Sequence, residues 1–203
     1  MRVVAGDYRG HTLKPVPGEG TRPTIDRVRE AMASSIVSRR GPIEGASVLD
    51  AFSGSGALGI EMLSRGAAHA TFLDSDRKAI ATIRGNIASV GADDRSAVRT
   101  LDTFAFASAG GTLPGAPFDL VFLDPPYAHT GDEVAALVVA FAVSGLLADE
   151  AIIVYEHRTG AFDPDTAEAL LGYNGNRPGD IEGTGLKRYG ATEVSYLRYR
   201  KGE

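Results

Sequence analysis

Short apolar runs alternate with helical segments along most of this chain, and no other sequence feature constrains its fold as strongly. We predict strands near 47–51, 69–74, 97–101, 118–124 and 151–156, and helices near 57–65, 77–90, 131–144 and 164–171, with a shorter helix near 103–108. Strands that are joined by helices pair in parallel and form a sheet covered on both faces. The alternation therefore predicts an α/β fold with a mostly parallel sheet.

The N-terminal residues depart from this alternation. Residues 2–8 and 11–14 flank a turn at Arg9-Gly10, which predicts a short β-hairpin. Residues 15–23 are rich in proline and glycine and predict an irregular loop. Helical periodicity follows from residue 24 to about residue 38.

The C-terminal residues also differ from the central part. Two β-like runs at 186–189 and 192–199, separated by Gly190-Ala191, predict a hairpin that adds an antiparallel edge to the sheet. We therefore divide the chain into an N-terminal extension of residues 1–40 and an α/β domain of residues 41–203.

Composition excludes several kinds of site. The 203 residues include no cysteine, so a disulfide or a thiolate site cannot form, and the four histidines lie far apart without ligand spacing. No stretch approaches the roughly 20 apolar residues of a membrane span, and the first residues lack the apolar core of a signal peptide. We expect a monomeric, cytoplasmic protein that has neither a metal nor a membrane partner.

Charge is distributed unevenly along the chain. The whole chain carries a net charge of −5, yet residues 1–40 hold eight Lys or Arg against four acids. A basic segment on an acidic body is typical of contact with a polyanion, although a solvated basic surface explains the same charge about as well. Arg22, Thr24, Arg27 and Arg29 lie where the first helix should begin and could contact phosphates, although salt bridges to nearby acids explain the arginines about as well.

Residues 48–59 predict a strand, a glycine loop and the start of a helix. Gly54, Gly56 and Gly59 have the spacing of a nucleotide-binding loop, in which glycines let a ligand approach the backbone. Asp74 is the last residue of the second predicted strand, 20 residues after Gly54, where its carboxylate can accept from ribose hydroxyls. Asp50 comes directly before the loop.

Asp50 distinguishes two classes of cofactor. A carboxylate at this position would repel the pyrophosphate of a nicotinamide dinucleotide, which binds at a helix N-terminus. S-adenosylmethionine has no phosphate and carries a sulfonium and an ammonium, which a carboxylate attracts. We therefore predict S-adenosylmethionine, with Asp102 as a candidate acceptor for its adenine amino group.

Asp124-Pro125-Pro126-Tyr127 follows the apolar run of the fourth predicted strand. Two prolines remove two N–H donors and fix two φ angles, so the chain leaves the strand as a stiff, extended loop. The carboxylate and a proline carbonyl can accept both hydrogens of an exocyclic base amine, while the Tyr127 ring offers a stacking face. The alternative is an ordinary turn at the end of a strand.

This loop predicts methylation of a base amine. The nitrogen of such an amine is a poor nucleophile because its lone pair is delocalised into the ring. Hydrogen bonds from both amine hydrogens, to Asp124 and the Pro125 carbonyl, would aim that lone pair at a methyl donor, and Asp124 could take the proton late. Glu156, which ends the fifth predicted strand, could line the substrate side or be a surface residue.

These motifs resemble the RsmD-type family of bacterial 16S rRNA guanine-N2 methyltransferases. The resemblance covers nearly the whole chain and rests on Arg2–Gly6 with Arg9-Gly10, Thr21–Thr24, Arg27–Ala31, Leu49–Gly59 with Ser64–Ala67, and Asp124–Tyr127. Two positions depart from the family pattern, since Ala33 stands where a bulky aromatic is usual and Asp74 where Glu is common.

The resemblance implies a Rossmann-like class I methyltransferase fold with seven strands, S-adenosylmethionine as donor, and a guanine of 16S rRNA in an assembling small subunit as acceptor. It assigns catalysis to Asp124, Pro125, Pro126 and Tyr127, cofactor binding to Asp50, Phe52, Gly54, Ser55, Gly56, Asp74 and Asp102, and RNA binding to Arg9, Arg22, Thr24, Arg27 and Arg29.

Other functions stay open at this point. The same proline motif would serve the N6 amine of adenine in DNA or RNA, although 203 residues show no separate domain for recognising a DNA target. A non-catalytic RNA-binding assembly factor could keep the cofactor fold, but intact Asp124 and Tyr127 argue against it. An NAD-dependent oxidoreductase is a weaker alternative.

Overall fold

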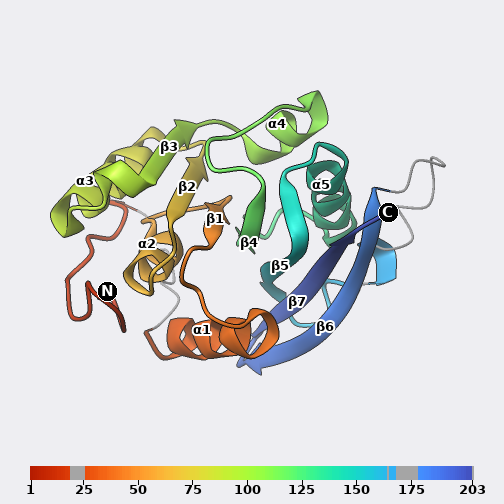
Figure 1. Cartoon of the computed structure of the whole chain (residues 1–203), viewed down its shortest axis with the longest axis horizontal. Coiled ribbons are helices and arrows are strands. Elements are labelled where there is room, and N and C mark those ends of the chain that lie inside the picture. Colours follow the sequence, from red (N-terminus) through yellow and green to blue (C-terminus); the bar gives the residue numbers. More distant parts are fainter. Residues whose placement is uncertain (19–25, 164, 168–177, 203) are drawn as a thin grey trace. The chain divides into compact units, whose positions relative to one another are not determined.

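The protein divides into two compact units, Met1–Thr103 and Phe104–Glu203 (Figure 1). The computed structural model describes residues 1–18, 26–163, 165–167 and 178–202. Within this described part, no helix is long and apolar enough to cross a lipid bilayer.

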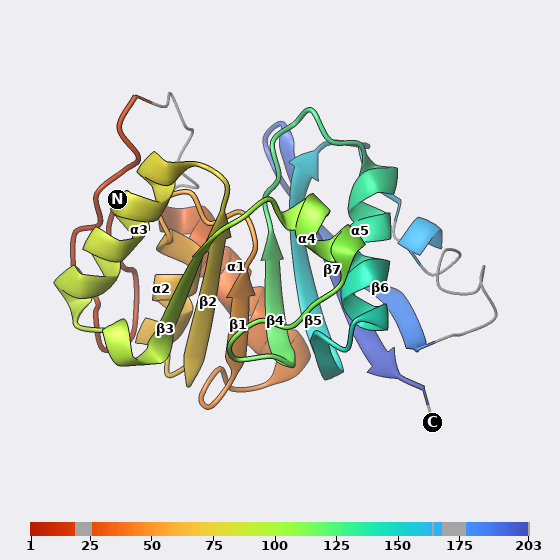
Figure 2. The same cartoon turned by 90° about the horizontal axis from the view of Figure 1, so that it is seen from above.

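The first unit contains three parallel strands in the order β3-β2-β1. Its elements are α1 (Asp26–Arg40), β1 (Ser47–Asp50), α2 (Ala57–Ser64), β2 (His69–Asp74), α3 (Arg77–Val90), the 3-10 helix η1 (Asp93–Arg95) and β3 (Ser96–Thr100). Helices α2 and α3 pack against these strands (Figure 2). Parallel pairing places the carboxyl ends of all three strands at one edge, where the glycine loop and Asp74 lie.

Local sequence explains the elements of this unit. The side chains of Val48 and Leu49 in β1, and of Phe72 and Leu73 in β2, are buried, as expected for strands that are covered on both faces. Helix α3 begins where the Asp76 side chain accepts a hydrogen bond from the Lys78 N–H. It ends at a glycine with a left-handed φ, which is a common helix stop.

The second unit contains four strands in the order β4-β5-β7-β6. Its elements are β4 (Phe118–Leu123), α5 (Gly131–Val143), β5 (Leu147–Arg158), β6 (Gly179–Tyr189) and β7 (Thr192–Lys201), and α4 (Thr103–Ala109) begins at the last residue of the first unit. Strands β4 and β5 are parallel, whereas β7 is antiparallel to both β5 and β6. A reciprocal capping box between Thr130 and Glu133 starts α5.

The predicted fold class is confirmed, because the described residues form seven strands, mostly parallel, with an antiparallel C-terminal hairpin. Most predicted elements agree with the structure within two residues, but β5 and β6 begin earlier than predicted, at Leu147 and Gly179. Polar and glycine-rich starts, such as 179–185, lack the apolar alternation that marks a strand. The predicted helix at 164–171 lies mostly outside the described residues.

The N-terminal hairpin is reduced to one isolated antiparallel bridge between Arg2 and Thr12. Backbone bonds from Val3 to His11 and from Gly10 to Val3 close the turn, but no ladder forms. Other backbone groups of this segment bond to side chains of α2 and α3 instead. The division into an extension of residues 1–40 and a domain of residues 41–203 stays a prediction.

Candidate cofactor and acceptor sites

The glycine loop follows β1 and is tied to the ends of two strands. The Ser53 N–H donates to the Leu73 carbonyl at 3.0 Å, and its hydroxyl donates to the Asp50 carbonyl at 2.7 Å. The Gly56 N–H donates back to the Ser53 carbonyl at 2.7 Å. These bonds fix the loop at the carboxyl edge of the first unit.

Asp74 fits the ribose-binding role that its sequence position predicts. One carboxylate oxygen accepts from the Gly54 N–H at 2.9 Å and the other from the Asp76 N–H at 2.9 Å. The side chain is half-buried, and each oxygen keeps a second lone pair for a ligand hydroxyl. A Cβ built on Gly54, whose φ is +52°, would meet nothing within 4 Å, so a ligand has room beside this backbone.

Asp50 is more enclosed than the sequence suggests. Its side chain is 3 % exposed, and one oxygen accepts from the Gly59 N–H at 3.0 Å, inside the first turn of α2. Burial raises the pKa of Asp50 from 3.8 to about 7, the Gly59 N–H opposes this shift, and the nearby Asp74 charge adds to it. A bound cation would lower this pKa again, so Asp50 suits the sulfonium or ammonium of S-adenosylmethionine and disfavours a phosphate.

The other predicted cofactor residues lie around the same loop. Phe52 is half-buried, and the Ser55 hydroxyl lies 3.4 Å from the Met1 sulfur. Asp102 is exposed and lies two residues beyond the end of β3. The buried Thr103 donates to the Ala51 carbonyl at 2.6 Å, which anchors the segment that carries Asp102 to the end of β1. The contact of Asp102 with adenine stays a prediction.

The Asp124–Tyr127 loop follows β4 in the second unit. Pro125 is buried, whereas Asp124 and Pro126 are exposed and the Tyr127 side chain is 53 % exposed. The Pro126 carbonyl accepts from the His129 N–H at 3.1 Å, which turns the chain toward α5. The loop is therefore anchored by a buried proline and presents its carboxylate and its aromatic ring to solvent.

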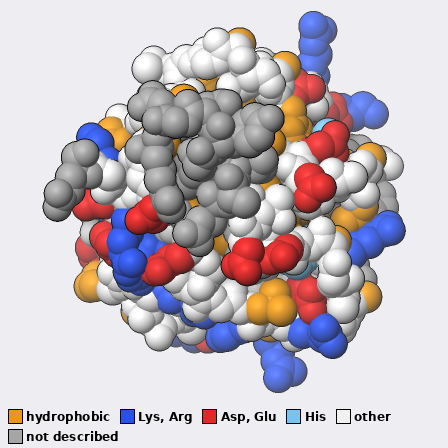
Figure 3. Space-filling model, turned by 90° about the vertical axis from the view of Figure 1, so that its right-hand side faces the viewer, with side chains coloured by type: hydrophobic (Ala, Val, Ile, Leu, Met, Phe, Trp, Pro, Cys, Tyr) orange, Lys and Arg blue, Asp and Glu red, His pale blue; other side chains and the backbone are white. Residues whose placement is uncertain are grey.

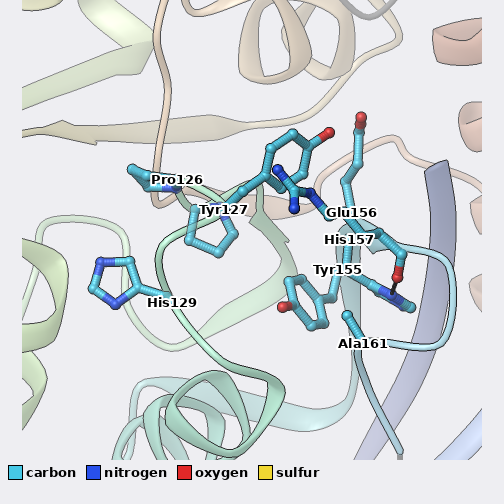
Figure 4. Close-up of a pocket in the computed structure, with 9 residues that line it drawn as sticks. Pro126, Tyr127, His129, Tyr155, Glu156, His157 and Ala161 are labelled. Carbon is cyan, nitrogen blue, oxygen red and sulfur yellow. Dashed lines mark hydrogen bonds between the residues drawn. The ribbon is translucent and has the colours of Figure 1, made fainter. Parts of the chain in front are cut away.

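A pocket lies beside this loop, and its walls come from the loop and from the end of β5 (Figure 4). It is lined by Pro125, Pro126, Tyr127, His129, Tyr155, Glu156, His157, Arg158 and Ala161. The Arg158 guanidinium lies over the Tyr127 ring, 4.6 Å from its centre. Glu156, for which the sequence left a substrate-side and a surface position open, is one of these lining residues, and its contact with a base stays a prediction.

Two side chains of the pocket, Tyr155 and His157, are buried. Burial raises the pKa of Tyr155 to about 12, and the charge of Asp124 adds to this shift. His157 Nδ1 lies 2.8 Å from the Arg158 carbonyl, which can only accept, so Nδ1 carries the proton. His157 Nε2 lies 2.8 Å from the Ser195 hydroxyl, and this hydrogen bond ties β5 to β7.

Sequence reasoning missed five residues of this pocket: His129, Tyr155, His157, Arg158 and Ala161. His129 comes two residues after Tyr127 and stacks on Phe104 with ring centres 4.1 Å apart. Arg158 and Tyr155 flank Glu156 at the end of a strand whose carboxyl end neighbours that of β4. The parallel pairing of the two strands could have indicated Tyr155 and Arg158, but nothing in the sequence fixes which side chains turn toward the loop.

The predicted RNA-binding residues divide into three groups. Arg9 and Arg27 are exposed and available to a phosphate. Arg29 is 1 % exposed and donates to the Arg2 carbonyl at 2.6 Å, so we assign it a structural contact within the protein. Arg22 and Thr24 lie outside the described residues. Figure 3 shows acidic and basic side chains intermixed on one face, which does not favour non-specific binding of polyanions there.

Comparison with known proteins identifies the family of the chain. A family model described as Conserved hypothetical protein 95 matches residues 1–182. The chain belongs to this family. Its relatives include ribosomal RNA small subunit methyltransferase D of Escherichia coli K12, with 38 % identity over 77 % of this chain and 74 % of that protein. YlbH of Bacillus subtilis, named as a candidate rRNA methyltransferase, is 36 % identical over 98 % of this chain and 100 % of its own length.

Solved structures agree with this assignment. A candidate methyltransferase of Escherichia coli, yhhF, has a TM-score of 0.77 and 32 % identity, and covers 100 % of this chain and 99 % of its own. A hypothetical protein of Thermus thermophilus has a TM-score of 0.72 and 25 % identity, with 97 % of this chain covered and 98 % of that chain. The resemblance to the RsmD-type family and the Rossmann-like methyltransferase fold are confirmed.

Proposed function

We propose that this protein methylates the exocyclic N2 amine of a guanine in 16S rRNA, with S-adenosylmethionine as donor. The observation that carries this proposal is the exposed Asp124-Pro125-Pro126-Tyr127 loop at the end of β4. It stands in a chain whose relatives include a ribosomal RNA small subunit methyltransferase D that matches 77 % of it. Loop and relatives indicate the same reaction class, transfer of a methyl group to a base of small-subunit rRNA.

In the first unit, the glycine loop, Asp74 and Asp50 would hold the cofactor. Asp74 can accept from ribose hydroxyls while it keeps its bond to the Gly54 N–H. Asp50 can accept from, or pair with, the cationic end of the ligand. When bound, S-adenosylmethionine supplies an electrophilic methyl group on a sulfonium.

In the second unit, the acceptor base would enter the pocket beside the Asp124–Tyr127 loop. Asp124 and the Pro125 carbonyl would accept the two amine hydrogens. Asp124 would take one proton as the N–C bond forms, while the S–C bond of the donor breaks and leaves a neutral thioether. The exposed ring of Tyr127 would stack on the base and fix its plane. The base must leave its own stack to reach this pocket, so a loop or a flipped nucleotide is the expected substrate.

We further propose that the substrate is an assembling small ribosomal subunit in the cytoplasm, which the protein meets as a monomer. A net charge of −5 disfavours tight binding to naked RNA, because phosphate contacts need basic groups. Arg9 and Arg27, both exposed, would supply local phosphate contacts. A ribonucleoprotein particle would add protein contacts that RNA alone lacks.

The test is methyl transfer from labelled S-adenosylmethionine to purified small subunits that lack the modification. We expect labelled N2-methylguanosine after digestion of the 16S rRNA. Labelled N6-methyladenosine, in this RNA or in DNA, would replace the proposal with an adenine methyltransferase. Cofactor binding without any transfer to particles or RNA would instead support a non-catalytic assembly factor.

A further inference from the structure

Asn86 lies in the middle of α3 and joins two segments that are distant in sequence. Its Oδ1 accepts from the Lys14 N–H at 2.8 Å, and its Nδ2 donates to the Lys14 carbonyl at 2.9 Å and to the Ser55 carbonyl at 2.9 Å. The residue is 1 % exposed. Both protons of the amide are therefore committed, one to the N-terminal segment, residues 1–16, and one to the glycine loop.

The N-terminal segment is docked on α2 by a second buried group. Glu61, which is 0 % exposed, accepts from the Val4 N–H at 2.8 Å and from the Ala5 N–H at 3.1 Å. A Cβ on Gly6, whose φ is +82°, would lie 1.8 Å from the Ser64 carbonyl oxygen, so the backbone rests directly on the helix. The segment is thus packed as part of the first unit.

Ser55 is the point at which the glycine loop meets this segment. Its carbonyl bonds to Asn86, and its hydroxyl lies 3.4 Å from the Met1 sulfur. A buried asparagine with only a structural role could form all its hydrogen bonds with one backbone segment. The Asn86 amide instead bonds to the N–H and the carbonyl of Lys14 and to the carbonyl of Ser55. If one of these two segments moves and the planar amide moves with it, the hydrogen bonds to the other segment weaken as well.

We propose that Asn86 is a positioning residue that couples the docking of the N-terminal segment to the shape of the cofactor loop. The affinity for S-adenosylmethionine then depends on contacts that Lys14 makes. By linkage, bound cofactor stabilises the docked segment in return. Because that segment also carries the exposed Arg9, occupancy of the cofactor site would help present this candidate RNA contact. The inference rests on the proposed function only for the identity of the cofactor.

Calorimetric titration with S-adenosylmethionine tests the coupling in the full-length protein. Asn86→Ala should weaken binding by about 10-fold or more, and Lys14→Pro, which removes the N–H donor, by about 5-fold, within the usual range of coupling between sites. Lys14→Ala keeps the N–H and should stay within about 2-fold of wild type. Equal affinities for the proline and alanine variants would overturn the proposal.

A control variant must show that Asn86→Ala lowers cofactor affinity through positioning and not only because it destabilises the protein. Ile87→Ala truncates a buried neighbour on the same helix and should lower the melting temperature without a comparable change in cofactor affinity. If Ile87→Ala weakens binding as much as Asn86→Ala, Asn86 has only a structural role. Failure of the wild type itself to bind the cofactor would contradict the proposed function, which is a different result.

Hydrogen exchange of the wild type keeps the test independent of any variant. Addition of S-adenosylmethionine should slow exchange of the Lys14 amide and of the Val4 and Ala5 amides, which bond to Glu61. Unchanged exchange at these three amides upon cofactor binding would overturn the proposal. In Asn86→Ala the protection should be lost even at saturating cofactor.

Discussion

The cofactor loop and the acceptor loop are held by different means. In the first unit, the backbone of residues 53–56 bonds to Leu73, Asp74, Asn86 and itself, so the loop is fixed by hydrogen bonds. In the second, two residues of the Asp124–Tyr127 loop have no N–H, so the proline rings fix its backbone, and Pro125 is buried. A loop fixed by hydrogen bonds suits a small ligand that returns in every cycle, whereas exposed groups on a stiff loop suit a base that arrives on a large particle.

If this contrast is correct, Asp124→Ala should have the largest effect and should act on turnover alone. We expect kcat on small subunits to fall by about 1,000-fold, because the carboxylate positions the amine and accepts its proton. Cofactor affinity should not change, since the residue belongs to the other loop. The measurement is methyl transfer together with calorimetry, with the exposed Asp132→Ala as matched control. Turnover near the wild-type rate would remove Asp124 from the mechanism.

Two substitutions of Tyr127 distinguish the contribution of its ring from that of its hydroxyl. Tyr127→Ala should lower kcat/KM by about 5- to 150-fold, since stacking of a base on an aromatic ring contributes about 1–3 kcal/mol. Tyr127→Phe keeps the ring and should remain within about 3-fold of wild type. A phenylalanine variant as impaired as the alanine variant would show that the hydroxyl, and not the ring, is needed.

Substitution of Asp50 tests the predicted cofactor site in the first unit. Its pKa in the folded state, about 7, lies above the unfolded value of 3.8, so the folded protein holds an extra proton between these values. Stability should fall as pH rises from 3.8 to about 7, and the full penalty should persist above pH 7. Asp50→Asn keeps an acceptor for the Gly59 N–H and should raise the free energy of unfolding at pH 8 by about 1–4 kcal/mol.

The same substitution should weaken binding of S-adenosylmethionine by about 10-fold, because the amide cannot pair with a cation. Affinity in the wild type should increase as pH rises through about 7, where Asp50 ionises. Chemical denaturation and calorimetry at pH 6 and pH 8 measure both effects. A more stable variant with undiminished affinity would show that Asp50 is a structural cap for α2 only.

Arg158 should have the smallest effect. Its guanidinium lies 4.6 Å from the centre of the Tyr127 ring at an exposed site, where such contacts contribute about 0.5–1 kcal/mol. Arg158→Ala should therefore lower kcat/KM by about 2- to 5-fold. In the Tyr127→Ala background the same change should have no further effect, and additive losses would show that Arg158 acts without the ring.

Most of the fold follows from local sequence, while the details of the sites depend on tertiary packing. The sequence predicts helix α3 with its observed bounds, Arg77 to Val90, and the structure shows local caps at both ends of this helix. Strand β6 was predicted too short because its first half is glycine-rich and polar, and it is formed by pairing with β7. Propensity is a weak guide where cross-strand contacts decide the structure.

The candidate sites show the same division. Gly54, Asp74 and the Asp124–Tyr127 loop could be identified because their spacing after apolar runs is read directly from the chain. The burial of Arg29 could not, since nothing in its sequence neighbourhood shows that the Arg2 carbonyl would meet its guanidinium. The same holds for Tyr155 and Arg158, which line the pocket through strand pairing.

The most direct test of the central claim is the nucleoside composition of 16S rRNA in cells that lack this protein. Plasmids would supply the wild type or Asp124→Ala at equal abundance. Mass spectrometry should show that one N2-methylguanosine per 16S rRNA is lost in the deletion strain, restored by the wild type and not restored by Asp124→Ala. An unchanged N2-methylguanosine content in the deletion strain, or full restoration by Asp124→Ala, would contradict the account.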